Sequence, residues 1–541
     1  MVWLLNDVYD VEHRAYFMSE KKMELTPLKI RSHGASSVMH YDERYTPYIE
    51  MTGLLPFVQL VSRSTPNLNA AAVTSLIDRW RPETHSFHLQ TGEMTVTLQD
   101  VSMITALPIE GKPLCMSTDS EGWRQQMEAL IGMSPQEPEV EDGGKKDRVP
   151  TGATFTWIAA NFAYCPEDAD DEVIQRYARV YMWYVISRTI FADGTGKNAP
   201  WMWLKALTVF DNKFSWGSAA LAYLYRQLDD ACRRTTKDGG VGGCMLLLSW
   251  DLVLEVASEV NLLYKQYTNE MDSLTPEQVE WEPYGVGTNF GDAHTFELNP
   301  LCVQERHLWL MRCPLICNWA VEFHLPHRVL RQFGYFQPHP PEWVDTDTQL
   351  HRLDRRRQRK IKDWRKHHKS YVLMFEQSVQ ATSSIQLTQY RQHCALAFSN
   401  YLRWFQESTR VEICPPAYEE DILEEPTEYD ELAQGGYSKL IHEGYQTSFA
   451  PVLNFVAADD MTLKAFQRSA YMLKPRKEFK RYSPDDYAKG KNLVAGGSRL
   501  SRMRSMDDEV EDDDDDESDD PEQFVVARRK KLASKRGRGP K

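Results

Sequence analysis

The chain has 541 residues, of which 42% are hydrophobic and 11% aromatic, and its formal net charge is −15. This length predicts one large globular body or two smaller ones, with appendages, and the hydrophobic and aromatic content excludes a chain that is disordered throughout. Nine cysteines without a regular spacing indicate reduced thiols in a cytosolic or nuclear protein and exclude a disulfide scaffold.

The N-terminal segment, residues 1–44, is expected to be a polar leader in front of the body. Its apolar start meets Asp7, Asp10 and Glu12 too early for a secretory signal peptide. The longest apolar run, residues 244–256, contains Ser, Asp and Glu and is shorter than the roughly 18 residues that a membrane-spanning helix needs. We therefore expect a soluble protein.

The body is expected to span residues 45–410 and to begin with two packed helices within residues 46–61 and 67–80, with breaks at Pro56 and Pro66. These segments have the apolar spacing of amphipathic helices. Helical patterning on both sides of residues 134–150, which are rich in proline, glycine and charge, makes that segment a mobile surface loop within one domain.

The period of hydrophobicity changes from helical to alternating after residue 80. Residues 84–98 alternate around Gly92, which predicts a β-hairpin whose glycine takes the positive φ of the turn. Thr97 and Asp100 have the spacing of a capping box, so a helix is expected to follow and to stop at Pro108.

Helical patterns dominate the rest of the body. Residues 171–191 are apolar on several faces and predict a central helix. Ser215 is expected to cap the next helix, and Pro326 and Gly334 are expected to begin and end another. The glycines of residues 239–243 predict a flexible connector before a buried helix, with anion binding by their backbone amides as the alternative.

The predicted fold class is therefore mainly α, a large single helical domain with a small β-hairpin component and a disordered, charged C-terminal tail. Residues 411–505 are expected to form a partly ordered C-terminal extension. Residues 506–541 are expected to form the disordered tail, acidic at first and then basic.

No catalytic, cofactor-binding or metal-ligating residue is predicted. His85 and His88 differ by an odd number of positions, so on one strand they face opposite ways, and we expect structural histidines. Cys313 and Cys317 lack the paired short spacings of structural zinc ligands and are expected to be core thiols. Residues 194–197, GTGK, lack the earlier glycine and the following Ser or Thr of a phosphate-binding loop.

Two basic segments are candidates for intermolecular contact. Residues 351–369 contain ten Lys or Arg residues around Trp364, a density that suits contact with phosphates or an acidic partner. A solvated helix face paired with acidic residues of the body is the alternative. The predicted nucleic-acid contacts are Arg355, Arg356, Arg357, Arg359, Lys360 and Lys362, together with Arg536 and Arg538 of the tail.

The tail carries the second basic segment. Residues 507–522 hold 13 acidic residues and residues 528–541 hold eight basic ones. Two basic clusters separated by a short spacer predict a nuclear import sequence, formed by Arg528, Arg529, Lys530, Lys531, Lys535, Arg536 and Arg538. Minor-groove contact by KRGRGPK, binding of basic partners such as histones by the acidic run, and an inert solvated tail remain alternatives.

Residues 78–114, DRWRPETHSFHLQTGEMTVTLQDVSMITALPIEGKPL, here called the signature stretch, resemble the plant mobile domain family, also called the aminotransferase-like plant mobile domain. The resemblance continues in order through FADGTG, FSWGSAALAYLYRQL, WEPY, CPLICNWAVEFHLPHRVLRQFG and YLRWFQEST, and it covers about residues 45–410. His327 departs from the family pattern, which often has an aspartate at this position.

This resemblance implies a plant nuclear protein from a lineage shared by host genes and transposable elements, linked to transposon silencing, genome stability and meristem maintenance. It implies nuclear protein partners, among them a protein phosphatase 7-like phosphatase, and contact with DNA, RNA or chromatin, without a membrane. We expect a non-catalytic module for protein–protein interaction and no cofactor. The alternative is an enzyme, either dependent on pyridoxal phosphate or a degenerate transposon-derived nuclease. The metal-binding GDxHG and GNHE motifs of the phosphatase are absent from the sequence.

Overall fold

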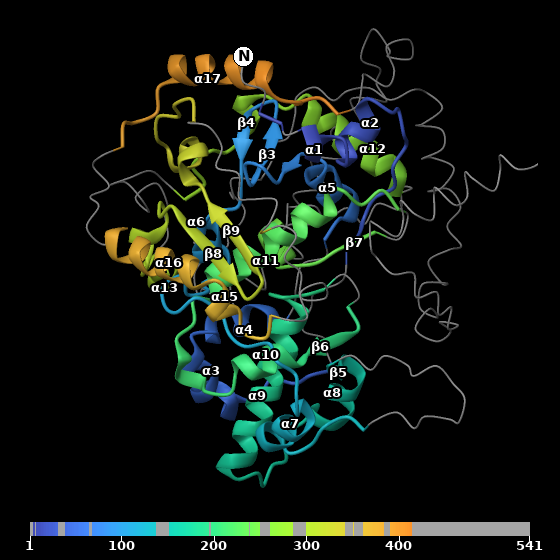
Figure 1. The fold of residues 1–541 in the computed structure, drawn as a ribbon, viewed down its shortest axis with the longest axis vertical. Coiled ribbons are helices and arrows are strands. Elements are labelled where there is room, and N and C mark those ends of the chain that lie inside the picture. The colour runs from blue at the N-terminus through green and yellow to red at the C-terminus, as the bar shows by residue number, and fades with distance from the viewer. Residues whose placement is uncertain are drawn as a thin grey trace, which may run out of the picture. The chain divides into compact units, whose positions relative to one another are not determined.

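The computed structural model describes residues 4–5, 7–30, 38–63, 68–136, 151–193, 196–236, 239–248, 260–284, 299–340, 350, 361–382 and 390–413. Helices dominate these residues and the strands form small separate sheets (Figure 1), which confirms the predicted mainly α fold with a small β component. Most of the predicted loop 134–150, most of the C-terminal extension and the whole tail lie outside the described residues. None of the described helices is long and apolar enough to cross a membrane.

The described α-helices follow the chain from the N-terminal segment to residue 408. They are α1 (Asp7–Asp10), α2 (Arg14–Ser19), α3 (Thr46–Thr52), α4 (Leu55–Arg63), α5 (Ala70–Ile77), α6 (Leu98–Thr105), α7 (Trp123–Ile131), α8 (Phe155–Phe162), α9 (Asp171–Arg188), α10 (Trp201–Ala206), α11 (Trp216–Ala231), α12 (Val260–Asp272), α13 (Pro300–Val303), α15 (Trp364–His367), α16 (Lys369–Thr382) and α17 (Ala395–Ser408).

The strands are short and pair within four small sheets. They are β1 (Lys29–Ile30), β2 (Trp80–Arg81), β3 (Ser86–Leu89), β4 (Gly92–Met94), β5 (Gly152–Thr154), β6 (Asn198–Pro200), β7 (Gly240–Val241), β8 (Cys313–Cys317) and β9 (Ala320–His324). The order β2-β3-β4 is antiparallel, as are the pairs β5-β6 and β8-β9, whereas β1 and β7 are parallel.

The predicted hairpin and the helix after it are confirmed. Strands β3 and β4 pair with Phe87 opposite Met94, and Gly92 at the turn has a φ of 110°. Thr97 and Asp100 form a reciprocal capping box at the start of α6, which satisfies backbone donors that the first helical turn leaves unpaired. The local signals in this stretch therefore specify the local structure.

The N-terminal segment is part of the packed body, so the body begins before residue 45. Strand β1 pairs with β7, with Lys29 opposite Gly240. The glycines of residues 239–243 are thus not a flexible connector, because they contribute a buried strand. A Cβ on Gly242 would lie 2.2 Å from the carbonyl oxygen of Ala192, so only glycine allows this close approach of two backbones.

The first predicted helix is divided in two at a glycine and not at the proline. Gly53 ends α3 with a φ of 77°, a conformation that glycine adopts without steric cost. Pro56 is the second residue of α4, where a proline fits because the backbone N–H there has no helical acceptor.

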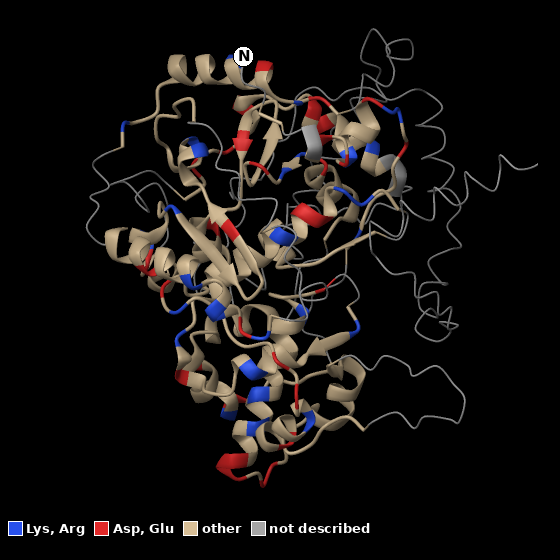
Figure 2. Ribbon diagram, viewed as in Figure 1, with Lys and Arg blue, Asp and Glu red and all other residues tan. Residues whose placement is uncertain are grey.

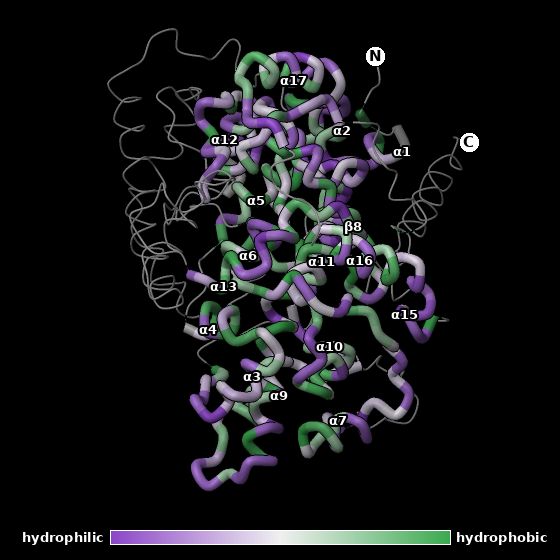
Figure 3. The backbone as a smooth tube through the Cα atoms, turned by 90° about the vertical axis from the view of Figure 1, so that its left-hand side faces the viewer, coloured by the Kyte–Doolittle hydropathy of each residue, from purple (hydrophilic) through white to green (hydrophobic). Residues whose placement is uncertain are grey.

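Helices α9 and α11 supply much of the hydrophobic core, and hydrophobic residues are frequent along α11 and β8 in Figure 3. The central helix predicted over residues 171–191 is confirmed as α9. Ser215 does precede α11, but its hydroxyl donates to the carbonyl oxygen of Ile109 at 2.6 Å and accepts no hydrogen bond from a backbone N–H of the first helical turn. Close packing of α11 on α6 requires Gly217, because a Cβ there would lie 2.8 Å from side-chain atoms of Val101 and Ile109.

Two segments predicted as α-helices contain 3₁₀ turns. Pro326–Arg328 and Leu330–Phe333 are separate 3₁₀ helices, and Gly334 ends the second with a φ of 76°. The buried helix expected after residue 243 begins as the 3₁₀ helix Met245–Leu248, and residues 249–259 lie outside the described ranges. Other 3₁₀ helices are Glu43–Tyr45, Phe210–Asn212, Pro276–Gln278 and Arg306–Leu308.

Candidate functional site

The signature stretch lies in the interior, although its sequence is rich in charge. Asp78, Arg79, Arg81, His85 and Glu93 are each at most 3% exposed. Charged groups this deeply buried need partners, because the loss of hydration must be offset. Charged residues of both signs lie along the elements around it, as Figure 2 shows for α11.

Each of these five side chains has a partner from a distant part of the chain. The pairs are Arg14 Nε–Asp78 Oδ1 at 2.6 Å, Arg79 Nη2–Asp272 Oδ1 at 2.5 Å, Arg81 Nη1–Asp10 Oδ1 at 2.9 Å, His85 Nε2–Glu322 Oε2 at 3.0 Å and Arg328 Nε–Glu93 Oε2 at 2.7 Å. The signature stretch therefore connects the N-terminal helices, α12, β9 and the turn after β9.

Arg14 shows how the N-terminal segment is held. Its guanidinium donates to Asp78, to the hydroxyl of Tyr264 at 3.1 Å, and to the carbonyl oxygens of Thr26 at 3.0 Å and Arg234 at 2.5 Å. This arrangement uses the five-donor fork of arginine almost completely. The predicted leader is thus joined to three other segments by one buried side chain.

The two histidines of the signature stretch lie in separate environments, so they do not share a site. His88 on β3 contacts the hydroxyls of Thr84 at 3.0 Å and Thr409 at 2.6 Å. Burial, with a smaller effect of Arg81, lowers the pKa of His88 well below its usual value, so the ring is neutral. The structural role predicted for His88 fits these contacts.

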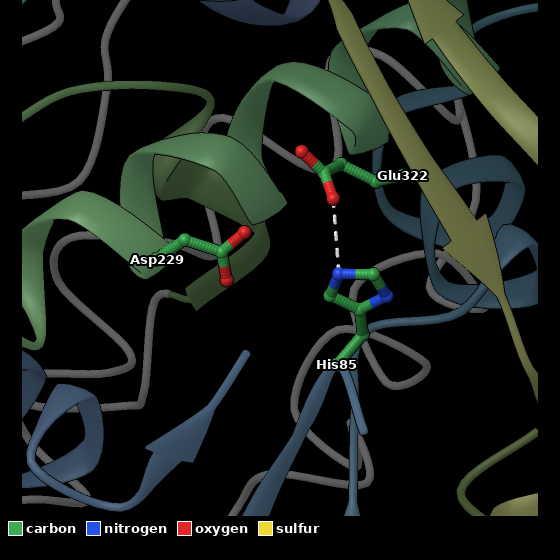
Figure 4. Close-up of side chains that lie close together, drawn as sticks. All are labelled: His85, Asp229 and Glu322. Atoms are coloured by element: carbon green, nitrogen blue, oxygen red, sulfur yellow. Dashed lines mark ion pairs between the residues drawn. The ribbon is translucent and has the colours of Figure 1, made fainter. Parts of the chain in front are cut away.

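His85 instead joins two carboxylates, a group that no sequence motif indicates. His85 precedes β3 and has a φ of 49°, a left-handed conformation that is uncommon outside glycine. Its ring lies with Asp229 of α11 and Glu322 of β9, and one potential ligand atom from each residue lies within 4.8 Å of the others. Figure 4 shows the three side chains converging from a loop, a helix and a strand. All three are buried.

Each member of this group, the His85–Asp229–Glu322 cluster, is held by a second contact. His85 Nδ1 lies 3.0 Å from the carbonyl oxygen of Phe323. Trp80 Nε1 donates to Asp229 Oδ1 at 2.7 Å, and Arg226 Nε donates to Glu322 Oε1 at 2.5 Å. Burial disfavours the charged guanidinium, but the carboxylates of Glu322, Asp229 and Asp230 together outweigh burial and raise the pKa of Arg226.

The sequence contains no signal for this cluster. Its members come from three elements far apart in the chain, and neither Asp229 nor Glu322 lies in a motif with metal-ligand spacing. The odd spacing of His85 and His88 correctly separates the two histidines, but it does not reveal partners on α11 and β9. The left-handed backbone of His85 is likewise visible only in the structure.

The basic segment 351–369 is described only from residue 361 onward, so Arg355, Arg356, Arg357, Arg359 and Lys360 lie outside the described residues. Lys362 is exposed and pairs with Asp119 at 3.1 Å and Glu121 at 3.6 Å. Trp364 is fully buried, donates to Thr118 Oγ1 at 2.9 Å and stacks on His368. Trp364 is therefore a core residue and is not placed to stack on a base. Arg365, Lys366, His367 and Lys369 are exposed.

The remaining predicted site residues have a simple outcome. The import residues Arg528, Arg529, Lys530, Lys531, Lys535, Arg536 and Arg538 lie outside the described residues. Cys313 and Cys317 are buried on β8, as predicted for core thiols. Burial, with smaller effects of Arg312 and Arg328, lowers the pKa of His327 to about 4, so the ring at this departure from the family pattern is neutral.

Comparison with known proteins identifies relatives in Arabidopsis thaliana. The chain is 30% identical over 389 residues to a serine/threonine-protein phosphatase 7 long form homolog, covering 64% of this chain and 27% of that protein. It is 31% identical over 312 residues to Protein MAIN-LIKE 1, covering 53% of this chain and 58% of the relative. It is 31% identical over 303 residues to Protein MAINTENANCE OF MERISTEMS, covering 51% and 59%.

The chain thus spans less than two thirds of the length of these relatives. No solved structure matches it. The family model described as plant mobile domain matches residues 56–254 and 241–406, a range that includes the signature stretch, the His85–Asp229–Glu322 cluster and the described part of the basic segment. The chain belongs to the plant mobile domain family.

Proposed function

We propose that this plant mobile domain protein is a non-catalytic interaction module of the nucleus, in which the basic segment 351–369 contacts nucleic acid. The observation that carries the proposal is the contrast between two charged regions. Four ionisable side chains of the signature stretch, Asp78, Arg79, Arg81 and Glu93, are buried in internal ion pairs, whereas cationic side chains of the basic segment are exposed.

The exposed cations follow one another on α15 and at the start of α16. Arg365, Lys366 and Lys369 are exposed, while Trp364 before them and His368 between them are buried. The buried rings fix the short helix to the body, and the charged side chains remain available to solvent. Such a series suits contact with phosphates, which position a nucleic acid without reading its sequence.

The pairs that Lys362 makes with Asp119 and Glu121 do not oppose such contact. Exposed ion pairs of this kind contribute little to stability, because water screens them. A polyanion with several phosphates within reach displaces them at small cost, although the acidic neighbours weaken the local attraction. An acidic protein surface is the second class of ligand for these cations, and binding measurements with both classes separate the two.

The nuclease alternative requires carboxylates that a phosphodiester can reach. Asp229 and Glu322 do form a cluster directed inward, but their side chains are at most 1% exposed and Glu322 already pairs with Arg226. This burial favours a structural role over phosphodiester cleavage.

The names of the relatives suggest meristem maintenance as the biological context and a phosphatase 7-like protein as a partner.

Fluorescence anisotropy with labelled duplex DNA, single-stranded DNA and RNA tests the proposal. We expect binding of at least one of these probes, with affinity that falls steeply as salt increases, because counterions are released from the phosphates. Binding to an acidic protein such as purified histone chaperone, without binding to any of the three probes, would replace nucleic acid with an acidic protein surface. If the chain binds neither the three nucleic-acid probes nor the acidic protein at low salt, the proposal is overturned.

A further inference from the structure

The His85–Asp229–Glu322 cluster has the arrangement of a metal-binding site. Whether His85 can bind a metal ion depends on which of its ring nitrogens carries the hydrogen. A carbonyl oxygen only accepts hydrogen bonds, so the contact between Nδ1 and Phe323 places the ring hydrogen on Nδ1. In the neutral ring Nε2 then presents its lone pair, and Nε2 lies 3.0 Å from Oε2 of Glu322.

A cation bound at this point would contact both Nε2 of His85 and Oε2 of Glu322. The distance of 3.0 Å fits two ligands of one ion, and it equally fits a hydrogen bond from a protonated ring. Adjacent ligands with bonds of about 2.1 Å lie about 3.0 Å apart around an octahedral ion and about 3.4 Å apart around a tetrahedral ion such as zinc. The ligand atom of Asp229 lies within 4.8 Å of both, so all three potential ligand atoms lie in one small buried region.

The contacts behind the three ligands fit a metal site as well. A ligating histidine usually donates its second ring N–H to a carbonyl or carboxylate, and ligating carboxylates usually accept a hydrogen bond at their other oxygen. Phe323 holds the histidine in this way. Trp80 holds Asp229 and Arg226 holds Glu322. Each ligand is thus oriented by a buried group of the surrounding fold.

We propose that His85, Asp229 and Glu322 bind one divalent first-row transition metal ion, with zinc as the probe. One imidazole and two carboxylates form a mixed nitrogen and oxygen ligand set, which suits zinc, manganese or iron and disfavours magnesium, an ion that prefers oxygen ligands and retains its waters. Since the three residues belong to the loop before β3, α11 and β9, the ion would join these elements, and its role is structural. This proposal does not rest on the proposed function.

The test uses the full chain without a polyhistidine tag. Metal content is measured by plasma mass spectrometry, and thermal unfolding is recorded after chelator treatment, with added Zn²⁺ or Mg²⁺. We expect close to one transition metal ion per chain as purified, and a melting temperature that rises with Zn²⁺ and not with Mg²⁺, since a ligand that binds the folded state stabilises it. A chain that contains no transition metal and does not respond to Zn²⁺ would overturn the proposal.

Single substitutions test whether the residues of the cluster bind the ion. Asp229→Asn keeps an oxygen that accepts from Trp80 but removes the charged ligand, and His85→Gln removes the imidazole. Both are expected to lose the metal and the response to Zn²⁺. His88→Gln is the matched control, because His88 is an equally buried histidine of the same stretch outside the cluster. This variant should keep both the metal and the response to Zn²⁺. Metal retained by folded Asp229→Asn and His85→Gln would place the ion elsewhere and overturn the assignment.

A proton is the competing occupant. A second proton on His85 would also supply a positive charge, and it would give an imidazolium between two carboxylates. Nitrogen-15 NMR of the histidine rings distinguishes the two states, because an imidazolium has both nitrogens protonated. Detection of that state for His85 in the metal-free chain as purified, with no effect of Zn²⁺, would show that the site holds a proton. Metal content, the response to Zn²⁺ and the NMR spectrum of the unsubstituted chain distinguish a metal ion from a proton even where a variant does not fold.

Discussion

Arg328 holds the carboxylate of Glu93 with two nitrogens, Nε at 2.7 Å from Oε2 and Nη2 at 2.8 Å from Oε1, and both residues are buried. The bidentate geometry links β4 to the turn that follows β9. Ser86 on the neighbouring strand also donates to Glu93, at 2.8 Å. The pair is thus part of the internal bonding that makes the signature stretch a scaffold.

Breaking this pair from one side is expected to be costly. Arg328→Met leaves the Glu93 carboxylate buried without its cation, which typically lowers the free energy of unfolding by about 3–5 kcal/mol. Urea denaturation followed by circular dichroism measures the change. The double variant Glu93→Met with Arg328→Met should recover part of the loss, because neither charge remains. Additive losses in the two single variants would contradict this coupling.

Removal of Arg14 is expected to destabilise the body to a similar degree, although Arg14 lies in the segment that the sequence pattern predicts to be a leader. Arg14→Ala leaves buried Asp78 without its ion pair and removes donors to two carbonyl oxygens, at a cost of about 3–5 kcal/mol. Lys22→Asn, at an exposed position of the same segment, should change stability by less than about 0.5 kcal/mol. Equal effects of the two substitutions in urea denaturation would show that the segment is not held in this way.

Acid is expected to destabilise the fold through His324. Its Nδ1 donates to the Met311 carbonyl at 2.7 Å and its Nε2 accepts from the backbone N–H of Leu98 at 3.3 Å, so the folded state holds a neutral ring. Burial lowers the pKa of His324 from 6.5 to about 4. The unfolded chain therefore binds the proton first as the pH falls.

The direction of this pH dependence follows from the linkage between proton binding and folding. The stability contributed by neutral His324 is present above pH 6.5 and is lost as the pH falls from about 6.5 to about 4, by an amount on the order of 3 kcal/mol. Urea denaturation at a series of pH values measures this loss. His324→Asn should flatten the dependence on pH, whereas His367→Asn, an exposed histidine, should leave it unchanged. An identical dependence on pH in the parent and in His324→Asn would rule out this contribution.

The basic segment is expected to determine how binding of nucleic acid depends on salt. Every cation that no longer neutralises a phosphate reduces the slope of log affinity against log salt by about 0.9. Reversal of charge at Arg355, Arg356, Arg357, Arg359, Lys360 and Lys362 should therefore weaken binding and make the slope shallower. Lys22→Glu with Lys112→Glu is the control at exposed sites outside the segment. A salt titration of the six-fold variant that matches the parent would remove the segment from the interface.

The tail is expected to direct import into the nucleus. Deletion of residues 523–541 removes both basic clusters and should lower the ratio of nuclear to cytoplasmic fluorescence of a tagged chain in plant cells. Deletion of the acidic residues 507–522 is the matched control and should leave this ratio unchanged. Unchanged nuclear accumulation after removal of both basic clusters would show that import depends on another segment.

The sequence by itself determined the elements whose signals are local. The turn at Gly92, the capping box of Thr97 and Asp100, and the long apolar helix α9 were all predicted and confirmed. These features depend on a glycine φ, on a bond between side chain and backbone within three residues, and on hydrophobic periodicity, which neighbouring residues specify.

Tertiary structure decided the rest, because the energies involved arise between distant segments. Neither the pairing of β1 with β7 nor the burial of Arg14 against Asp78 follows from a local pattern. The hydroxyl of Ser215 could cap a helix, but it donates to the carbonyl of Ile109 and accepts from no N–H of the first helical turn. The left-handed backbone of His85 turns its ring toward Glu322. The charges of the signature stretch identify the family, but only the packed fold shows that they face inward and which partners they meet, since a buried charge is stable only beside its counterion.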